Sequence, residues 1–156
     1  MSVFAERISV EQVELGDALV PRFDAQGLIP CVVIETGTRE VLMLGYMNAE
    51  AIELTLDTGE AHFWSRSRQA LWRKGEHSGF VQHVEQLRVD DDQDALLLEV
   101  RLRGPGSCHV GFRTCFYRQV LTPERPDAPP RLAFVETEAA FDAALVYAGL
   151  DNPTQV

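Results

Sequence analysis

Apolar residues in the first half of the chain fall into short, nearly continuous runs separated by turn signals. The segments 28–35 and 40–47 are compact and apolar, and the first is rich in β-branched residues, while 36–39 between them (Thr-Gly-Thr-Arg) is typical of a turn. Runs that are apolar at almost every position are typical of strands buried on both faces. The pattern therefore predicts a largely buried hairpin over residues 28–47.

Two segments have helical character. The first begins after Asn48, a good N-cap, and ends before Gly59, which stands where a left-handed C-terminal residue belongs. The second is an alanine-rich segment that Thr137 caps and Gly149 follows, with its apolar residues on one face. We predict a helix at each place, the second over 137–149.

The rest of the chain reads as strands and one linker. Strand-like segments follow at 61–66, 80–90, 95–103 and 108–120. Four prolines within eight residues mark 122–136 as a linker. The predicted fold is α+β, a mostly antiparallel sheet with one or two helices, in which a domain over 1–121 is followed by the linker and the C-terminal helix.

Charge limits the partners of this chain. Among 156 residues, 14 Lys and Arg stand against 24 Asp and Glu, a net charge of -10. Nucleic acid polymers and anionic membranes need a basic surface, so we expect neither as a partner. Three cysteines are too few for a disulfide framework, no apolar run has the length of a membrane span, and the first residues lack the order of a signal peptide. We expect a cytoplasmic protein with reduced thiols.

The first candidate for chemistry is an acidic run. Asp90, Asp92 and Asp94 share one side of an extended chain, about 6.6 Å apart, and Asp91 points to the other side. Mg²⁺ suits such a group because it keeps several waters and takes few direct carboxylates. A solvated acidic turn is the alternative.

The second candidate is a pair of cysteines. Cys108 and Cys115 can face one ion if Gly111 lets the chain bend between them, and His109 stands beside the first. The alternative is that both are small buried hydrophobic residues, which is what we expect of Cys31.

The third candidate lies within residues 63–79, where this acidic chain concentrates its cations. Arginine forks match phosphate oxygens, hydroxyl groups add donors, and a tryptophan can stack on a base. The candidate binding residues are Trp64, Ser65, Arg66, Ser67, Arg68, Trp72, Lys74, Gly75, Glu76 and Ser78. A basic exposed turn is the alternative, but the residues favour a small phosphorylated nucleotide over a polymer, which the rest of the chain would repel.

These three segments, in this order, resemble the phosphoribosyl-AMP cyclohydrolase family of histidine biosynthesis. The resemblance runs from about residue 27 to residue 118 and rests on Phe-Trp-Ser-Arg-Ser-Arg, Leu-Trp-Arg-Lys-Gly-Glu-x-Ser-Gly and Cys-His-x-Gly-x-x-x-Cys-Phe. It implies an α+β homodimer with sites between subunits. It also implies hydrolysis of the N1–C6 bond of the purine ring of phosphoribosyl-AMP, with a catalytic Zn²⁺ and a bound Mg²⁺.

The resemblance also implies roles for single residues. It assigns Mg²⁺ to Asp90, Asp92 and Asp94. It assigns the catalytic metal to Cys108 and Cys115, and proton transfer to His109. Asp91 stands where the family has a third zinc cysteine. A carboxylate is a harder donor than a thiolate, so zinc preference should fall and tolerance of Fe²⁺ or Mn²⁺ should rise.

Further departures from the family pattern lie near the substrate loop. His77 replaces a threonine, Phe80 replaces a polar residue, and the turn 104–107 is one residue longer. The favoured function is metal-dependent ring opening of phosphoribosyl-AMP. The alternatives are a related hydrolase that acts on another purine-like nucleotide and a non-catalytic metal-binding paralogue.

Overall fold

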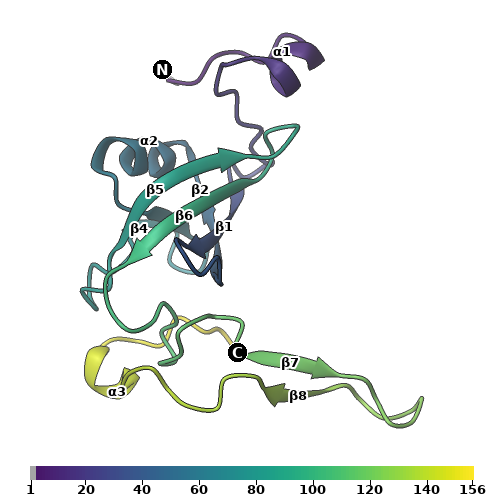
Figure 1. Ribbon diagram of the computed structural model, residues 1–156, viewed down its shortest axis with the longest axis vertical. Helices are drawn as coiled ribbons and strands as arrows, with labels where there is room; N and C mark the ends of the chain where they lie inside the picture. Colours follow the sequence, from purple (N-terminus) through teal and green to yellow (C-terminus); the bar gives the residue numbers. More distant parts are fainter. Residues whose placement is uncertain (1–2) are drawn as a thin grey trace.

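The computed structural model describes residues 3–156, so the first two residues of the predicted domain 1–121 lie outside it. Its main sheet has the strand order β2-β1-β6-β5 (Figure 1). The strands are β1 (Ile29–Glu35), β2 (Val41–Met47), β5 (Gln82–Val89) and β6 (Leu96–Leu102). Only the central β1–β6 pair is parallel. The predicted α+β class with a mostly antiparallel sheet is confirmed.

The hairpin predicted over 28–47 is confirmed as β1 and β2. Ile29 pairs with Met47 and Val33 with Met43, and all four side chains are buried. Their core continues through the inward residues of β6, among them Leu98 and Val100. Burial of these runs is the main stabilising contribution to the sheet, at about 1.5–3 kcal/mol for each large side chain.

Helix α2 (Ala49–Thr58) closes one side of this core. Asn48 accepts a hydrogen bond from the Ala51 amide at 2.9 Å, and Gly59 follows in the left-handed conformation at φ 70°, so both predicted caps are confirmed. Ala51 and Ile52 are fully buried in the core cluster.

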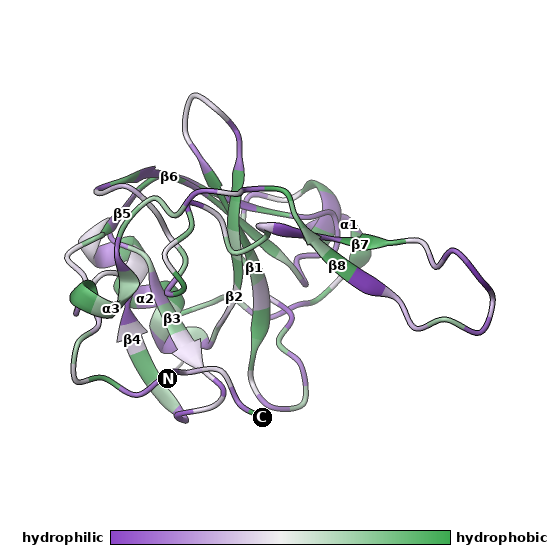
Figure 2. Cartoon of the chain, turned by 90° about the horizontal axis from the view of Figure 1, so that it is seen from below, coloured by the Kyte–Doolittle hydropathy of each residue, from purple (hydrophilic) through white to green (hydrophobic). Residues whose placement is uncertain are grey.

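Two hairpins lie beside the main sheet. Strands β3 (His62–Ser65) and β4 (Ala70–Arg73) form the first, and only β3 lies in a segment predicted to be strand-like. Strands β7 (Arg118–Leu121) and β8 (Arg131–Phe134) form the second, which projects from the body with a hydrophilic tip (Figure 2). The strand predicted over 108–120 is therefore mainly a loop, and the predicted linker 122–136 contains a strand.

The predicted helices need two corrections. Residues 3–156 contain three helices, since α1 (Val10–Leu15) was not predicted. The helix expected over 137–149 is only α3 (Ala143–Val146), capped by Asp142 and not by Thr137. The reason is tertiary, because the amides of Ala140 and Phe141 donate to the Gly111 carbonyl instead of starting a helix. No helix in this range is long and apolar enough to cross a membrane.

Candidate active site

The cysteine loop, residues 103–117, follows β6 and turns back on itself at Gly111. The Cys108 amide donates to the Phe112 carbonyl at 3.1 Å, and the Gly111 amide donates to the Cys108 carbonyl at 3.0 Å. Gly111 has φ +109°, a backbone conformation that residues with a side chain rarely adopt. The turn brings Cys108 and Cys115 within hydrogen-bonding reach of each other, which confirms the bend predicted at Gly111.

The far side of this loop is fixed to strand β2. The Cys115 amide donates to the Leu42 carbonyl at 2.8 Å, and the Thr114 hydroxyl donates to the Val41 carbonyl at 2.6 Å. Arg113 forms ion pairs with Glu35 and Glu40 at the β1–β2 end. Cys115 is thus held on backbone that the main sheet orders.

Lys74 places a buried positive charge beside the two thiols. Its Nζ donates to the Ser107 carbonyl at 2.5 Å and lies 5.4 Å from the Trp72 ring centroid. Burial lowers the pKa of Lys74, an effect that the charges of Cys115 and Cys108 oppose. The ammonium group that the sequence suggested for substrate binding therefore points into the cysteine loop.

The environment makes the two thiols unequal. The hydrogen bond between them lowers the pKa of Cys108 to about 6, with a smaller contribution from Lys74, and raises the pKa of Cys115. Cys108 is therefore the member of the pair that holds its thiolate form at neutral pH, the form that ligates metals.

His109 lies half-buried next to Cys108. Burial lowers the pKa of its imidazole, Lys74 lowers it further, and hydrogen bonding to Asn152 raises it. The ring is therefore mostly neutral near pH 7, and a neutral imidazole can accept a proton.

The β3–β4 turn gathers the predicted phosphate ligands. The Arg68 amide donates to the Ser65 hydroxyl at 3.3 Å, and the Ser65 and Ser67 hydroxyls lie 3.4 Å apart. The Arg66 guanidinium lies 4.0 Å from the Tyr46 ring centroid, so Tyr46 fixes a cation that the sequence did not link to it. Two guanidinium groups and two hydroxyls thus share one exposed turn.

Other predicted binding residues have a structural function as well. Trp72 packs on Phe63 with ring centroids 5.4 Å apart. Trp64, the residue after Phe63 on β3, is half-buried. A Cβ at Gly75 would lie 2.5 Å from the Val81 amide nitrogen, so only glycine fits there. Glu76 is exposed, 3.4 Å from His77.

The aspartate turn, residues 90–94, joins β5 to β6. Carboxylate oxygens of Asp90, Asp92 and Asp94 all lie within 4.8 Å of one another. The chain is not extended here, since Asp90 accepts from the Asp94 and Ala95 amides at 3.0 and 3.1 Å. The predicted grouping is found, but a turn and not strand alternation produces it. Burial and the charges of Asp92 and Asp90 raise the pKa of Asp94.

Gln93 ties this turn to the N-terminal segment. It is buried at φ 56°, its Oε1 accepts from the Val20 amide at 2.8 Å, and its Nε2 donates to the Val13 carbonyl at 2.9 Å. Arg22 pairs with Asp92 at 3.7 Å on the surface of the same contact. The N-terminal segment therefore supports the aspartate turn from outside.

Replacing Gln93 by alanine should lower the free energy of unfolding by about 1–3 kcal/mol, because the Val20 amide would lose a buried partner. Urea denaturation measures this change, with the exposed Gln26→Ala variant as a control expected to match the wild type. Equal free energies of unfolding for the two variants would contradict the stabilising function of Gln93.

The aspartate turn and the cysteine loop lie at opposite ends of the β5–β6 pair (Figure 1). Strand β6 has seven residues, which span roughly 20 Å. Within one chain, Asp91 therefore cannot reach an ion held by Cys108 and Cys115, and a shared site requires a second copy.

The family model described as phosphoribosyl-AMP cyclohydrolase matches residues 43–117. A phosphoribosyl-AMP cyclohydrolase of Nitrobacter hamburgensis is 51% identical over 135 residues, 86% of this chain and 90% of that protein. Proteins of the same name from Caulobacter sp. and Brucella canis are 53% and 54% identical, over 75% and 78% of this chain and 88% and 89% of their own. The chain belongs to the phosphoribosyl-AMP cyclohydrolase family.

Several residues around the site of this family member carried no signal in the sequence. The buried Gln82 donates from Nε2 to the Ser107 hydroxyl at 3.0 Å, while its Oε1 has no hydrogen-bond partner among residues 3–156. The chain end also reaches His109, where the Thr154 hydroxyl lies 3.4 Å from Nε2. Gln82, a polar side chain inside a predicted strand, was the one sign of these contacts in the sequence. The contacts of the chain end join distant segments and leave no local pattern.

Proposed function

We propose that this protein is a metal-dependent phosphoribosyl-AMP cyclohydrolase of histidine biosynthesis. Membership of the family at more than half identity supports the reaction. The observation that carries the metal dependence is the return of the cysteine loop, which sets Cys108 against Cys115 with His109 beside them. Reduced thiols of this kind suit the cytoplasm.

The residues present fit a divalent transition metal. The two thiols lie within hydrogen-bonding reach of each other, the lowered pKa of Cys108 favours its thiolate, and Asp91 of a second copy would offer the third charged donor. When bound, such an ion supplies a water that ionises near neutral pH. Mg²⁺ would be held by Asp90, Asp92 and Asp94, whose oxygens lie close enough to share one hydrated ion.

His109 is the proton-transfer residue of this proposal. Its neutral imidazole accepts a proton as water adds to C6 of the purine ring, and it returns a proton to N1 as the N1–C6 bond breaks. Burial and Lys74 keep the ring neutral, and therefore ready to accept, at physiological pH.

Substrate phosphate is bound at the β3–β4 turn. Guanidinium groups match phosphate oxygens, and on this turn Arg68 Nε donates to the Ser65 hydroxyl, which lies 3.4 Å from that of Ser67. The negative charge of the rest of the chain repels long polyanions, so the turn selects a small nucleotide. Glu76 and Ser78, on the following loop, would contact the sugar.

The active unit in this proposal is a homodimer with two equivalent sites. Strand β6, which spans roughly 20 Å between the aspartate turn and the cysteine loop, supports this assignment, because a two-fold partner can bring one chain's aspartate turn to the other chain's cysteines.

Ring opening of phosphoribosyl-AMP by metal-free protein, with and without added Zn²⁺, Fe²⁺ or Mn²⁺, tests the proposal. We expect turnover only with metal. Binding of zinc without turnover under any of these conditions would instead identify a non-catalytic metal-binding protein.

Asp91→Cys tests the choice of metal. We expect this variant to bind zinc at least about tenfold more tightly and to lose activity with Mn²⁺, since a thiolate is softer than a carboxylate. Tight stoichiometric zinc in the wild type, unaltered by the substitution, would refute an altered preference.

A further inference from the structure

The C-terminal segment, residues 139–154, packs against the cysteine loop. The Ala140 and Phe141 amides donate to the Gly111 carbonyl at 2.7 and 3.2 Å. A Cβ at Gly111 would lie 2.8 Å from the Phe141 carbonyl oxygen, and one at Gly106 would lie 3.0 Å from the Phe141 ring. Two glycines of the cysteine loop thus permit a close contact with a segment that follows about 30 residues later in the chain.

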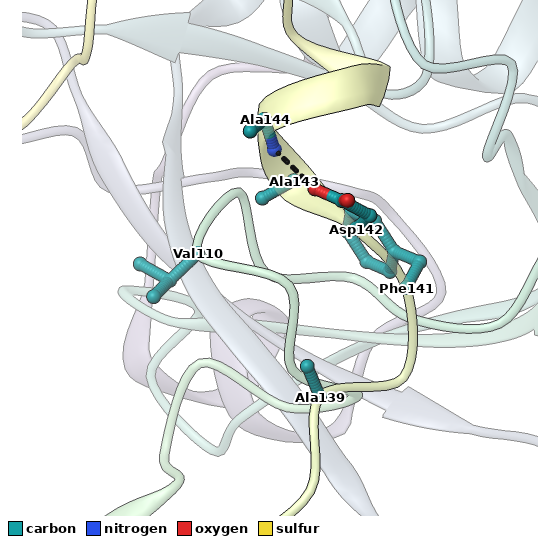
Figure 3. A pocket seen from close by; sticks show the side chains of 6 residues that line it. All are labelled: Val110, Ala139, Phe141, Asp142, Ala143 and Ala144. Carbon is teal, nitrogen blue, oxygen red and sulfur yellow. Dashed lines mark hydrogen bonds between the residues drawn. The ribbon is translucent and has the colours of Figure 1, made fainter.

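The contact also includes the loop after Lys74. The rings of Phe80 and Phe141 meet edge to face with centroids 5.0 Å apart, and Tyr147 lies within hydrogen-bonding reach of Ser78. Phe80, which departs from the family pattern, thus has a partner in the C-terminal segment. A hollow of about 600 Å³ follows the seam, with Val110 on one side and residues 139 and 141–144 on the other (Figure 3).

The end of the segment lies over His109. The Thr154 hydroxyl is 3.4 Å from Nε2 of the imidazole, and the Asn152 side chain is within hydrogen-bonding reach of the same ring. Lys74 acts on the imidazole electrostatically from the body of the protein. The polar side chains that approach His109 closely therefore come from the chain end.

We propose that the C-terminal segment is part of the active site, in which Asn152 and Thr154 are positioning residues that set the orientation of the His109 ring. This rests on the proton-transfer function proposed for His109. The Thr154 amide donates to Asn152 Oδ1 at 2.9 Å, which ties the two residues together beside the ring. A ring held in one orientation loses less entropy on reaching the reactive geometry.

The double variant Asn152→Ala/Thr154→Val tests this with zinc-loaded protein. We expect kcat for phosphoribosyl-AMP to fall about tenfold while KM, bound zinc and the melting temperature stay unchanged. Thr154→Ser should retain wild-type kcat, and so should the exposed Gln155→Ala control. Unchanged kcat in the double variant, or a loss of kcat accompanied by loss of zinc, would overturn the proposal.

A spectroscopic measurement separates this proposal from the function of His109 itself. The ¹⁵N shifts of the His109 ring nitrogens should move in the double variant while those of His62 stay fixed; unmoved shifts would refute the positioning contact. His109→Ala with wild-type turnover would refute the proton-transfer function instead. The double variant is also made in the His109→Ala background. If it still lowers kcat tenfold there, the segment acts by another route, and the proposal is overturned.

Discussion

Replacing His109 by alanine is expected to lower kcat by about two to four powers of ten, the range in which a positioned acid–base group contributes. The imidazole is half-buried and its lowered pKa keeps it neutral, so the variant removes a group that is ready to accept a proton at pH 7. Single-turnover measurement of ring opening with saturating metal isolates this step.

His83→Gln is the matched control for that variant. His83 lies on strand β5, outside the cysteine loop, and its substitution should leave kcat within about twofold of the wild type. Bound metal should be equal in both variants. A His109→Ala protein whose kcat matches that of His83→Gln would remove His109 from the mechanism.

Mixing two inactive variants is expected to restore activity. Asp91→Ala and Cys115→Ala should each lower kcat by more than about a hundredfold, because each removes one donor of the proposed metal site. In a mixed dimer, one site combines the intact cysteines of one chain with the intact Asp91 of the other. A two-fold dimer has two equivalent sites, so the purified mixed dimer should recover about half of wild-type activity.

Co-expression with two different N-terminal tags supplies the mixed dimer. The matched control is a mixed dimer of Cys108→Ala with Cys115→Ala, which carries a lesion in the cysteine pair of both chains and should stay inactive. Recovery in that control, or none in the first mixture, would refute a site shared between Asp91 and the cysteines of a second copy.

Features of the fold that depend on local sequence could be predicted. The β1–β2 hairpin follows from two apolar runs around a turn, and α2 follows from Asn48 and Gly59, whose caps the structure confirms. The convergence of Cys108 and Cys115 also had a local cause, since Gly111 lies between them at a positive φ.

Features that depend on distant partners could not be predicted. The helix expected over 137–149 is wrong for most of its length because Gly111 captures the amides of Ala140 and Phe141. Strand β4 forms because it pairs with β3, where Phe63 lies opposite Trp72. No local pattern marks Asn152 or Thr154 as neighbours of His109. The pairing of Asp91 with the cysteines stays a prediction.

The position of the chain end over His109 has a consequence for protein synthesis. The match to the family model ends at residue 117, so a ribosome has made that part of the chain well before it reaches the codons for Asn152 and Thr154. The imidazole gains these neighbours only after residues 152–154 have left the ribosome, later than the rest of its surroundings. A tag placed next to Thr154 would lie close to the His109 imidazole, so reporters belong elsewhere in the chain.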